Sequence, residues 1–245
     1  MKIIGLIPSR LNSTRLPNKA LLPIHGLPLV VHTFKRAQLA KSLSEVYVCT
    51  DSEEIAQAVL AHGGRVIMTS SEHTNGTERI AEAAQQLKAD YFVDIQGDEP
   101  LINPDHIDAT VAAHVQHPEW DILLPSLPIS QPESLHVVKV VHDKSMRVMF
   151  LSRSVIPQPF RHRPAYYLKH LSIISFLPDA LQRFASFPPG DLEIAESVEL
   201  LRALEHGLIV GTTLLDGNSL SVDVEEDYVK AKIQMLDDSI CKRYS

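Results

Sequence analysis

The stretch IIGLIPSRLNSTRLPNK, residues 3–19, begins as an apolar run of strand length and continues as a loop carrying Arg10, Arg15 and Lys19. Further runs of strand length follow along the first half, with segments of helical period between them. The expected strands cover residues 3–7, 46–50, 65–68 and 91–95, and the expected helices cover residues 28–39, 53–62, 76–87 and 104–117. Such alternation predicts βαβ units around a mainly parallel sheet.

The pattern changes after Trp120, where prolines stand at positions 125, 128 and 132. The expected elements are paired strands at 137–141 and 147–151, a loop at 157–164, a strand at 169–176, a helix at 191–206 with Asp191 as N-cap, a strand at 208–212 and a helix at 224–236. These features predict an α/β fold in which a smaller antiparallel part, residues 121–204, is inserted into a core formed by residues 1–120 with 205–245.

Composition narrows the class of protein. The 245 residues are 44% hydrophobic and 22% charged, as in folded globular proteins. The net charge of −7 argues against a nucleic-acid binder. Apolar runs fall far short of the roughly 20 residues of a membrane span. With no visible signal peptide, we expect a cytoplasmic protein without a membrane partner.

The loop after the first strand offers three cations with Ser9, Ser13 and Thr14 close by. Ligands of open α/β sheets bind beyond the carboxyl ends of the strands, and this loop leaves such an end. The loop is therefore a candidate cradle for a triphosphate. A merely solvated basic loop is the alternative, because Lys and Arg are most often exposed.

A second motif, DIQGDEP at residues 94–100, ends the fourth expected strand. Asp98 lies just beyond the apolar run, where a carboxylate can hold Mg²⁺ against nucleotide phosphates. Gly97 would let the backbone come close to a ligand. A turn rich in Asp and Gly is the alternative interpretation.

Two weaker motifs complete the set. HTNGTERI, residues 73–80, offers a turn at Asn75 and a cap candidate at Thr77, with exposed backbone groups that can read a nucleobase edge. SVDVEED, residues 221–227, places Asp223 where it can complete a metal site or cap a helix. Of the two cysteines, Cys49 lies in an expected strand and Cys241 near a C-terminus that we expect to be frayed.

These segments, in this order, resemble the CMP-KDO synthetases, the 3-deoxy-manno-octulosonate cytidylyltransferases, within the wider family of CMP-sugar synthetases. The resemblance covers nearly the whole chain. It rests on IPSRLNSTRLPNK, CTD at 49–51, GGRVIMT at 63–69, GTER at 76–79, QGDEP at 96–100, VVKVV at 137–141, FLSRSVIP at 150–157, LKH at 168–170 and ELLR at 199–202.

The resemblance implies a Rossmann-like, mainly parallel sheet with a smaller antiparallel part for sugar binding and dimerisation. It implies that the chain is a CTP-dependent nucleotidyltransferase using Mg²⁺, with CTP and an acidic sugar as substrates, and that it forms a homodimer. The implied nucleotide-binding residues are Ser9, Arg10, Arg15, Lys19, His73, Asn75, Gly76, Arg79 and Gln96. Asp98 and Asp223 would hold the metal and would act in catalysis with Arg10 and Lys19. The implied acceptor-binding residues are Lys139, Arg153, His170, Glu193 and Glu196.

The sugar half departs from the family pattern more than the nucleotide half. Ile174 stands where the family has an aromatic hydroxyl, Leu200 where it has an amide, and His136 where it has Asn; in the nucleotide half, Asn75 stands for Ser. Losing hydroxyl-binding groups alters acceptor choice more than CTP binding. We therefore expect the acceptor to be 3-deoxy-manno-octulosonate or a close ulosonic acid, with a modified acid such as an 8-amino octulosonate, or a nonulosonate, as the alternative. A non-catalytic nucleotide-binding protein is the remaining alternative.

Overall fold

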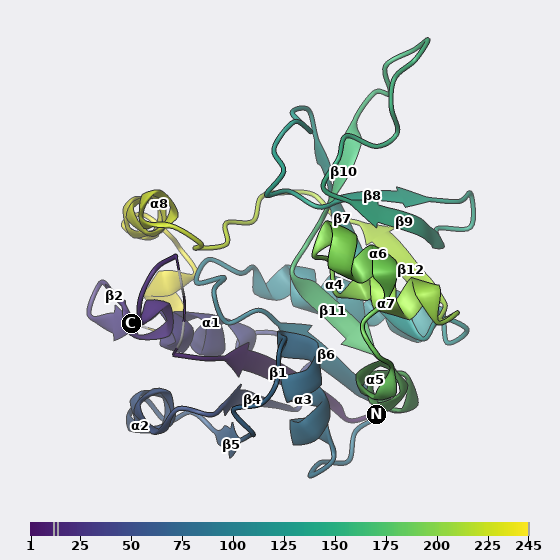
Figure 1. The fold of residues 1–245 in the computed structure, drawn as a ribbon. Coiled ribbons are helices and arrows are strands. Elements are labelled where there is room, and N and C mark those ends of the chain that lie inside the picture. Colours follow the sequence, from purple (N-terminus) through teal and green to yellow (C-terminus); the bar gives the residue numbers. More distant parts are fainter. Residues whose placement is uncertain (12, 14, 245) are drawn as a thin grey trace. The chain divides into compact units, whose positions relative to one another are not determined.

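The computed structural model describes residues 1–11, 13 and 15–244, and its fold is an α/β fold as predicted (Figure 1). Thr14 therefore lies outside the described residues. The chain forms two compact units: unit 1 is Met1–Asp108 with Ser219–Ser245, and unit 2 is Ala109–Asn218. The boundary falls inside helix α4 (Pro104–Gln116). The functional division at residues 120 and 205 stays a prediction.

Unit 1 is built on a parallel sheet in the order β5, β4, β1, β6. Its strands are β1 (Ile3–Ser9), β4 (Glu45–Thr50), β5 (Val66–Met68) and β6 (Tyr91–Ile95), with a short hairpin of β2 (Pro23–Ile24) and β3 (Leu27–Pro28). Its helices are α1 (Leu29–Ala37), α2 (Glu53–Ala61), α3 (Gly76–Ala84), α8 (Glu225–Met235) and the 3-10 turns η1 (Lys19–Leu21) and η2 (Cys241–Arg243). Every residue of β1 is buried, as expected of a central parallel strand. The strands and helices predicted here are confirmed to within about three residues at each end.

A cluster of buried side chains joins the loop after β1 to the C-terminal helix. Leu16 and Ile24 from the first part of the chain pack with Val222, Tyr228 and Met235 from around α8. Tyr228 Oη also donates a hydrogen bond to the Pro23 carbonyl. This packing brings the segment before α8 to the same region as the loop after β1, although more than 200 residues separate them.

The C-terminal end is anchored, so the expectation of a frayed C-terminus is wrong. Arg36 of α1 is 1% exposed and forms an ion pair with Asp238. Its guanidinium also donates to the Ile102 carbonyl at 3.1 Å and to Tyr244 Oη at 3.3 Å. A charge this deeply buried needs such partners, and they hold the last turn of the chain in place.

Unit 2 is organised around β7 (Ile122–Ile129), which pairs antiparallel with β10 (Tyr167–His170) and β11 (Ile173–Phe176) and parallel with β12 (Val210–Leu214). β10 pairs with β8 (Lys139–His142), and β8 pairs with β9 (Val148–Ser152), both antiparallel. The antiparallel pair predicted at 137–141 and 147–151 is thereby confirmed. Its helices are α5 (Pro178–Ser186), α6 (Asp191–Glu196) and α7 (Leu200–Glu205).

Three predictions for unit 2 are wrong in detail. The expected strand at 169–176 is two strands, because Leu171 N–H turns to the Pro125 carbonyl and Ile173 N–H to the Leu171 carbonyl. The expected helix at 191–206 is broken at Ser197, whose φ of 52° is left-handed. Gly190, rather than Asp191, is its N-cap.

Two elements of unit 2, β7 and α5, carry no matching prediction. β7 was not predicted because it contains prolines, and proline is scarce within sheets.

Within the described residues, no helix is both long enough and apolar enough to cross a membrane.

Candidate functional site

Two carboxylates in unit 1 meet on one ammonium group. Lys19 Nζ lies 2.7 Å from Asp98 Oδ2 and 3.5 Å from Asp223 Oδ1. Arg15 Nη2 lies 2.9 Å from that same oxygen of Asp223. We call Asp98 and Asp223 the acidic pair. The structure thus brings together four of the residues singled out in the sequence, from three separate segments.

Two hydrogen bonds hold together the segments that carry the acidic pair. Val222 N–H donates to the Asp98 carbonyl at 2.9 Å, and Ser221 Oγ donates to Glu99 Oε1 at 2.6 Å. These two bonds tie the segment before α8 to the turn after β6. The segments that carry the two carboxylates are therefore held together by bonds that do not involve Lys19.

The turn after β6 depends on Gly97. A Cβ built on Gly97 would lie 2.6 Å from the Pro8 carbonyl oxygen, closer than real Cβ contacts allow. Thr33 Oγ1 donates to the Gly97 carbonyl at 3.2 Å, which holds the turn from its other side. The close approach of this turn to the end of β1 places Asp98 beside the loop that carries Lys19.

Ser9 and Arg10 stand at the carboxyl end of β1. Ser9 is the last residue of the strand and is 8% exposed. Arg10 is exposed and makes no ion pair within the described part of the chain. The guanidinium of Arg10 is thus available to a ligand at the end of the sheet where ligands of this fold class bind.

Residues 73–79 are held mainly by contacts among themselves and with nearby turns. Asn75, not Thr77, is the N-cap of α3, because its Oδ1 accepts from Glu78 N–H at 2.8 Å. His73 pairs with Glu82. Arg79 is 3% exposed, and its guanidinium donates to Thr69 Oγ1 at 2.6 Å.

Two further residues of the expected nucleotide site lie close to these segments. A Cβ on Gly76 would meet Pro8 Cγ at 3.2 Å and Gln96 Nε2 at 3.5 Å. Gln96 Nε2 donates to Asp94 Oδ2 at 2.8 Å, which orients the amide at the end of β6. The structure therefore gathers Gly76 and Gln96 at the end of β1, whereas Arg79 is a buried tie between turns.

The acidic pair fits a divalent cation of the magnesium kind. Mg²⁺ in phosphate-transfer sites is commonly held by one or two carboxylates, with waters and substrate phosphates completing the shell. Among the described residues, no group of three or more His, Cys, Asp or Glu side chains is arranged to hold a metal. The acidic pair could therefore hold such a cation with two carboxylates, and waters and substrate phosphates would supply the other ligands.

In unit 2, the guanidinium of Arg153 is held entirely by backbone carbonyls. Nε donates to Glu196 O at 2.8 Å, Nη1 to Leu135 O at 3.0 Å and Nη2 to Ser197 O at 3.0 Å. The left-handed backbone of Ser197 ends α6 next to this group. Arg153 has no carboxylate partner within the described chain, so its position is fixed while its charge is not neutralised by an acid.

The carboxylate of Glu196 lies against the backbone of Arg153 rather than its side chain. Its Oε1 accepts from Ser152 Oγ at 2.6 Å, and its Oε2 accepts from Arg153 N–H at 2.8 Å. Lys139 is 0% exposed, and its ammonium donates to the carbonyls of Ser134, Val137 and Arg153. Burial lowers the pKa of Lys139. All three of its N–H groups are engaged.

Two other expected acceptor residues are enclosed in unit 2. Glu193 forms a bidentate ion pair with Arg202, at 2.7 Å for each of two contacts, so its carboxylate is engaged in packing α6 on α7. His170 donates its backbone N–H to Val138, and its buried Nδ1 has no partner among the described residues. Burial lowers the pKa of His170 to about 4, so the ring is neutral at pH 7.

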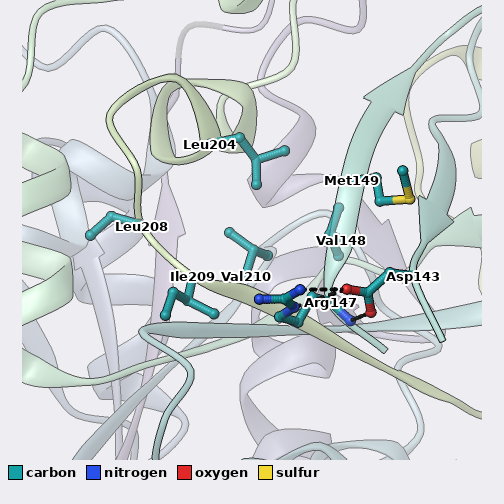
Figure 2. Close-up of a pocket in the computed structure, with 8 residues that line it drawn as sticks. All are labelled: Asp143, Arg147, Val148, Met149, Leu204, Leu208, Ile209 and Val210. Atoms are coloured by element: carbon teal, nitrogen blue, oxygen red, sulfur yellow. Dashed lines mark hydrogen bonds and ion pairs between the residues drawn. The ribbon is translucent and has the colours of Figure 1, made fainter. Parts of the chain in front are cut away.

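A shallow pocket of about 250 Å³ also lies in unit 2 (Figure 2). Its lining is mostly apolar, and its charged members, Asp143 and Arg147, pair with each other at 2.9 Å. It adjoins the Val148 end of β9, whereas Ser152 and Arg153 are at the opposite end of that strand. Converging polar groups make the Arg153 region the stronger candidate for binding a charged ligand.

Sequence patterns did not reveal Ser221 or Ser197. Ser221 joins the segment of Asp223 to the turn of Asp98 by its bond to Glu99, and Ser197 supplies a carbonyl to Arg153. A left-handed serine carries no local signal of the kind that glycine gives. The SVDVEED motif marked the segment of Ser221 but not the role of its hydroxyl.

A family model described as cytidylyltransferase matches residues 4–214 of the chain. The chain belongs to the cytidylyltransferase family. It is 41% identical over 242 residues to a 3-deoxy-manno-octulosonate cytidylyltransferase of Pelodictyon phaeoclathratiforme, covering 96% of this chain and 98% of that protein. The family assignment confirms the resemblance read from the motifs.

Two further relatives bear on the substrate. An 8-amino-3,8-dideoxy-manno-octulosonate cytidylyltransferase of Shewanella piezotolerans is 39% identical, covering 93% of this chain and 96% of that protein. A solved structure of CMP:2-keto-3-deoxy-manno-octonic acid synthetase complexed with CTP matches with a TM-score of 0.92 at 34% identity, covering 96% of this chain and 99% of that one. The family thus holds relatives named for two different acceptors at similar identity.

Proposed function

We propose that the chain transfers CMP from CTP to the anomeric hydroxyl of 3-deoxy-manno-octulosonate or a close ulosonic acid and releases pyrophosphate, with Mg²⁺ as cofactor. The observation that carries the proposal is the convergence of Lys19, Asp98 and Asp223 in a chain that is 41% identical, over nearly its full length, to a cytidylyltransferase for that sugar.

The residues of unit 1 have the chemistry that the nucleotide requires. Arg10, Arg15 and Lys19 are cations that can bind the triphosphate and neutralise the charge that builds on the leaving pyrophosphate. Ser9, Gly76 and Gln96 lie at the end of β1 and β6, where we assign the cytidine. In this proposal His73, Asn75 and Arg79 shape the turn around the base, and their own contacts keep that turn rigid.

In the reaction, the anomeric oxygen forms a bond to the α-phosphorus in line with the bond to the β-phosphate oxygen, which breaks. The hydroxyl proton is lost to solvent, and pyrophosphate carries away the bonding pair. Bound at the acidic pair, Mg²⁺ would neutralise triphosphate charge and lower the pKa of the attacking hydroxyl. The protein's own contribution is chiefly positioning.

We assign the acceptor's carboxylate to Arg153. Its guanidinium is fixed by three carbonyls and has no acid partner in the described chain, so a substrate carboxylate would be its ion-pair partner. Glu196 lies beside it with both oxygens hydrogen-bonded, and those oxygens retain lone pairs for a sugar hydroxyl. His170, neutral at pH 7, is assigned a hydrogen bond to the acceptor.

The test is pyrophosphate release with CTP and Mg²⁺ across a panel of acceptors: 3-deoxy-manno-octulosonate, its 8-amino analogue and a nonulosonic acid. Turnover that needs CTP, the metal and an ulosonic acid supports the proposal. Absence of turnover with every acid, while CTP binds normally, would favour a non-catalytic nucleotide-binding protein.

The 8-amino acid is the second candidate acceptor. It is favoured by the relative named for that acid at 39% identity and by two apolar residues of unit 2, Ile174 at 5% and Leu200 at 2% exposure. Aliphatic side chains have no hydrogen-bond donor or acceptor. Ile174 and Leu200 therefore cannot hydrogen-bond a hydroxyl of the acceptor, as polar side chains at these positions could. Comparing kcat/KM for the two acids decides between them.

The homodimer and the cytoplasmic location stay predictions from the family resemblance. Sedimentation equilibrium tests the first, and fractionation of the producing cells tests the second. A monomer that is fully active would remove dimerisation from the proposal without affecting the chemistry assigned to either unit.

A further inference from the structure

The acidic pair is already neutralised by the chain's own cations. Lys19 contacts both carboxylates and Arg15 contacts Asp223, so two negative charges face two positive ones. The side chain of Lys19 is 16% exposed and that of Asp98 is 27% exposed. These groups are partly withdrawn from water, where charge interactions are screened less than on an open surface.

The ammonium of Lys19 lies where a cation shared by both carboxylates would lie. Its Nζ is within 3.5 Å of an oxygen from each, and the bonds of Val222 and Ser221, which do not involve Lys19, hold together the two segments that carry these carboxylates. Removing the ammonium would therefore leave the two segments in place, and their carboxylates would have less compensating charge.

We infer that Lys19 is an internal counter-ion that competes with the divalent cation for the acidic pair until a nucleotide triphosphate draws it away. This inference rests on the proposed function. A metal ion arriving alone must displace an ammonium whose acid partners, among the described residues, are these two carboxylates. A triphosphate supplies that partner, so Lys19 and Arg15 can turn to phosphate oxygens while the carboxylates take up the metal.

The consequence is positive coupling between metal and CTP. CTP gives Lys19 a new partner and so lowers the cost of metal binding, and the metal likewise lowers the cost of moving Lys19 when CTP binds. The factor by which CTP raises the affinity for the metal must equal the factor by which the metal raises the affinity for CTP. Couplings of this kind typically change affinity by about 5- to 150-fold. An incidental surface ion pair would instead predict that removing Lys19 leaves the affinity for the metal nearly unchanged, because such pairs contribute little.

The experiment measures Mn²⁺ binding without nucleotide, by the loss of the free-ion EPR signal, in the wild-type protein and in Lys19→Met, Lys19→Arg and Lys88→Met. We expect Lys19→Met to bind Mn²⁺ about tenfold more tightly than the wild type. Lys19→Arg keeps the charge and should bind Mn²⁺ weakly. Lys88 is an exposed lysine of unit 1, so Lys88→Met controls for a general loss of positive charge.

Adding Asp98→Asn to Lys19→Met should abolish the gain, which locates it at the acidic pair. Mn²⁺ affinity in Lys19→Met equal to or weaker than that of the wild type overturns the inference. Equal gains in Lys19→Met and Lys88→Met overturn it too, since the effect would then be one of net charge.

The wild-type protein provides a second measurement that needs no variant. Its affinity for CTP is measured in EDTA and at saturating Mn²⁺ by calorimetry, with the binding of Mn²⁺ to free CTP subtracted. The coupling is supported if CTP binds more tightly with metal than in EDTA, by the same factor by which CTP raises the affinity for Mn²⁺. Equal affinities for CTP in the two conditions contradict it. A protein that binds no CTP refutes the proposed function, whereas the nucleotide-free comparison still tests Lys19 by itself.

Discussion

The candidate sites of the two units hold their cations in opposite ways. In unit 1, Lys19 and Arg15 are paired with carboxylates, and their charges are neutralised within the chain. In unit 2, Lys139 and Arg153 are held by backbone carbonyls, three for each side chain, and Arg153 has no acid partner in the described residues. The acidic pair in unit 1 is bound by ion pairs, and the candidate acceptor site in unit 2 carries a guanidinium fixed by carbonyls.

The difference suits the ligands that we assign. A flexible lysine can leave a carboxylate for a phosphate as the nucleotide and metal arrive. A carboxylate on a sugar is better met by a guanidinium whose rotamer is already fixed, because less entropy is lost on binding. Variants that change one kind of cation without the other can therefore separate nucleotide chemistry from acceptor binding.

The largest effect is expected for Asp98→Asn, which halves the charge of the acidic pair. Removing a residue that only hydrogen-bonds a metal ligand lowers activity about 10- to 100-fold. Removing the charge of a ligand itself should therefore lower kcat by more than about 100-fold. Steady-state kinetics at saturating CTP and acceptor measure it. Asp237→Asn, at an exposed aspartate of unit 1, is the control and should retain full activity. Loss of tenfold or less would remove Asp98 from the metal site.

Arg153→Met should raise the KM for the acceptor by about 10- to 100-fold, since a hydrogen bond to a charged group contributes about 1.5–3 kcal/mol. The KM for CTP should stay within about twofold, because the nucleotide residues lie in unit 1. Lys cannot reproduce the three-carbonyl geometry, so Arg153→Lys should recover little. If both KM values rise equally, the division between nucleotide and acceptor residues is wrong.

Much of the nucleotide half could be predicted from sequence. Strand periodicity located β1, β4 and β6, and the position of Asp98 after β6 followed from where parallel strands end. The pairing of Asp98 with Asp223 could not be obtained from local pattern. It depends on Leu16 and Val222 packing in one cluster, which is tertiary information.

The acceptor half was harder for a physical reason. Lys139 and Glu193 are charged residues, and a charged residue in a motif suggests ligand binding, yet both are satisfied within the fold. The left-handed Ser197 divides a helix that periodicity predicted to be continuous. Only contacts between distant segments distinguish a charge that holds the fold from a charge that meets a substrate.

A pH experiment tests which groups of unit 2 are charged. Burial lowers the pKa of His170 from its ordinary value of 6.5 to about 4. At a pH between these two values, the unfolded chain binds a proton at His170 that the folded chain does not. Stability is therefore retained above pH 6.5 and lost as the pH falls toward 4. Between pH 7 and pH 5 the loss from this group is roughly 2 kcal/mol.

Urea unfolding at pH 7 and pH 5 measures the free energy of unfolding in wild type, His170→Gln and His162→Gln. His170→Gln should reduce the pH-dependent loss by roughly 2 kcal/mol. His162 is exposed in a loop of unit 2, so His162→Gln should leave the loss unchanged. Equal losses in the wild type and His170→Gln would mean that the ring is accessible to protons in the folded state.

The smallest effect on activity is expected for Lys139→Met. This variant tests whether Lys139 positions Arg153 or binds the acceptor itself. All three N–H groups of Lys139 bond to carbonyls, one of them that of Arg153, so its role here is to position Arg153. Lys139→Met should raise the acceptor KM roughly two- to tenfold, the cost of an ordinary hydrogen bond. Lys144→Met, at an exposed turn of unit 2, should have no effect.

The double variant Lys139→Met with Arg153→Met provides the sharper measurement. If Lys139 acts only through Arg153, the double variant should have the acceptor KM of Arg153→Met alone, since the group that Lys139 positions is already gone. If Lys139 bound the acceptor directly, the two effects would multiply. Additivity would therefore return Lys139 to the acceptor site and would require its ammonium to leave the three carbonyls when the sugar binds.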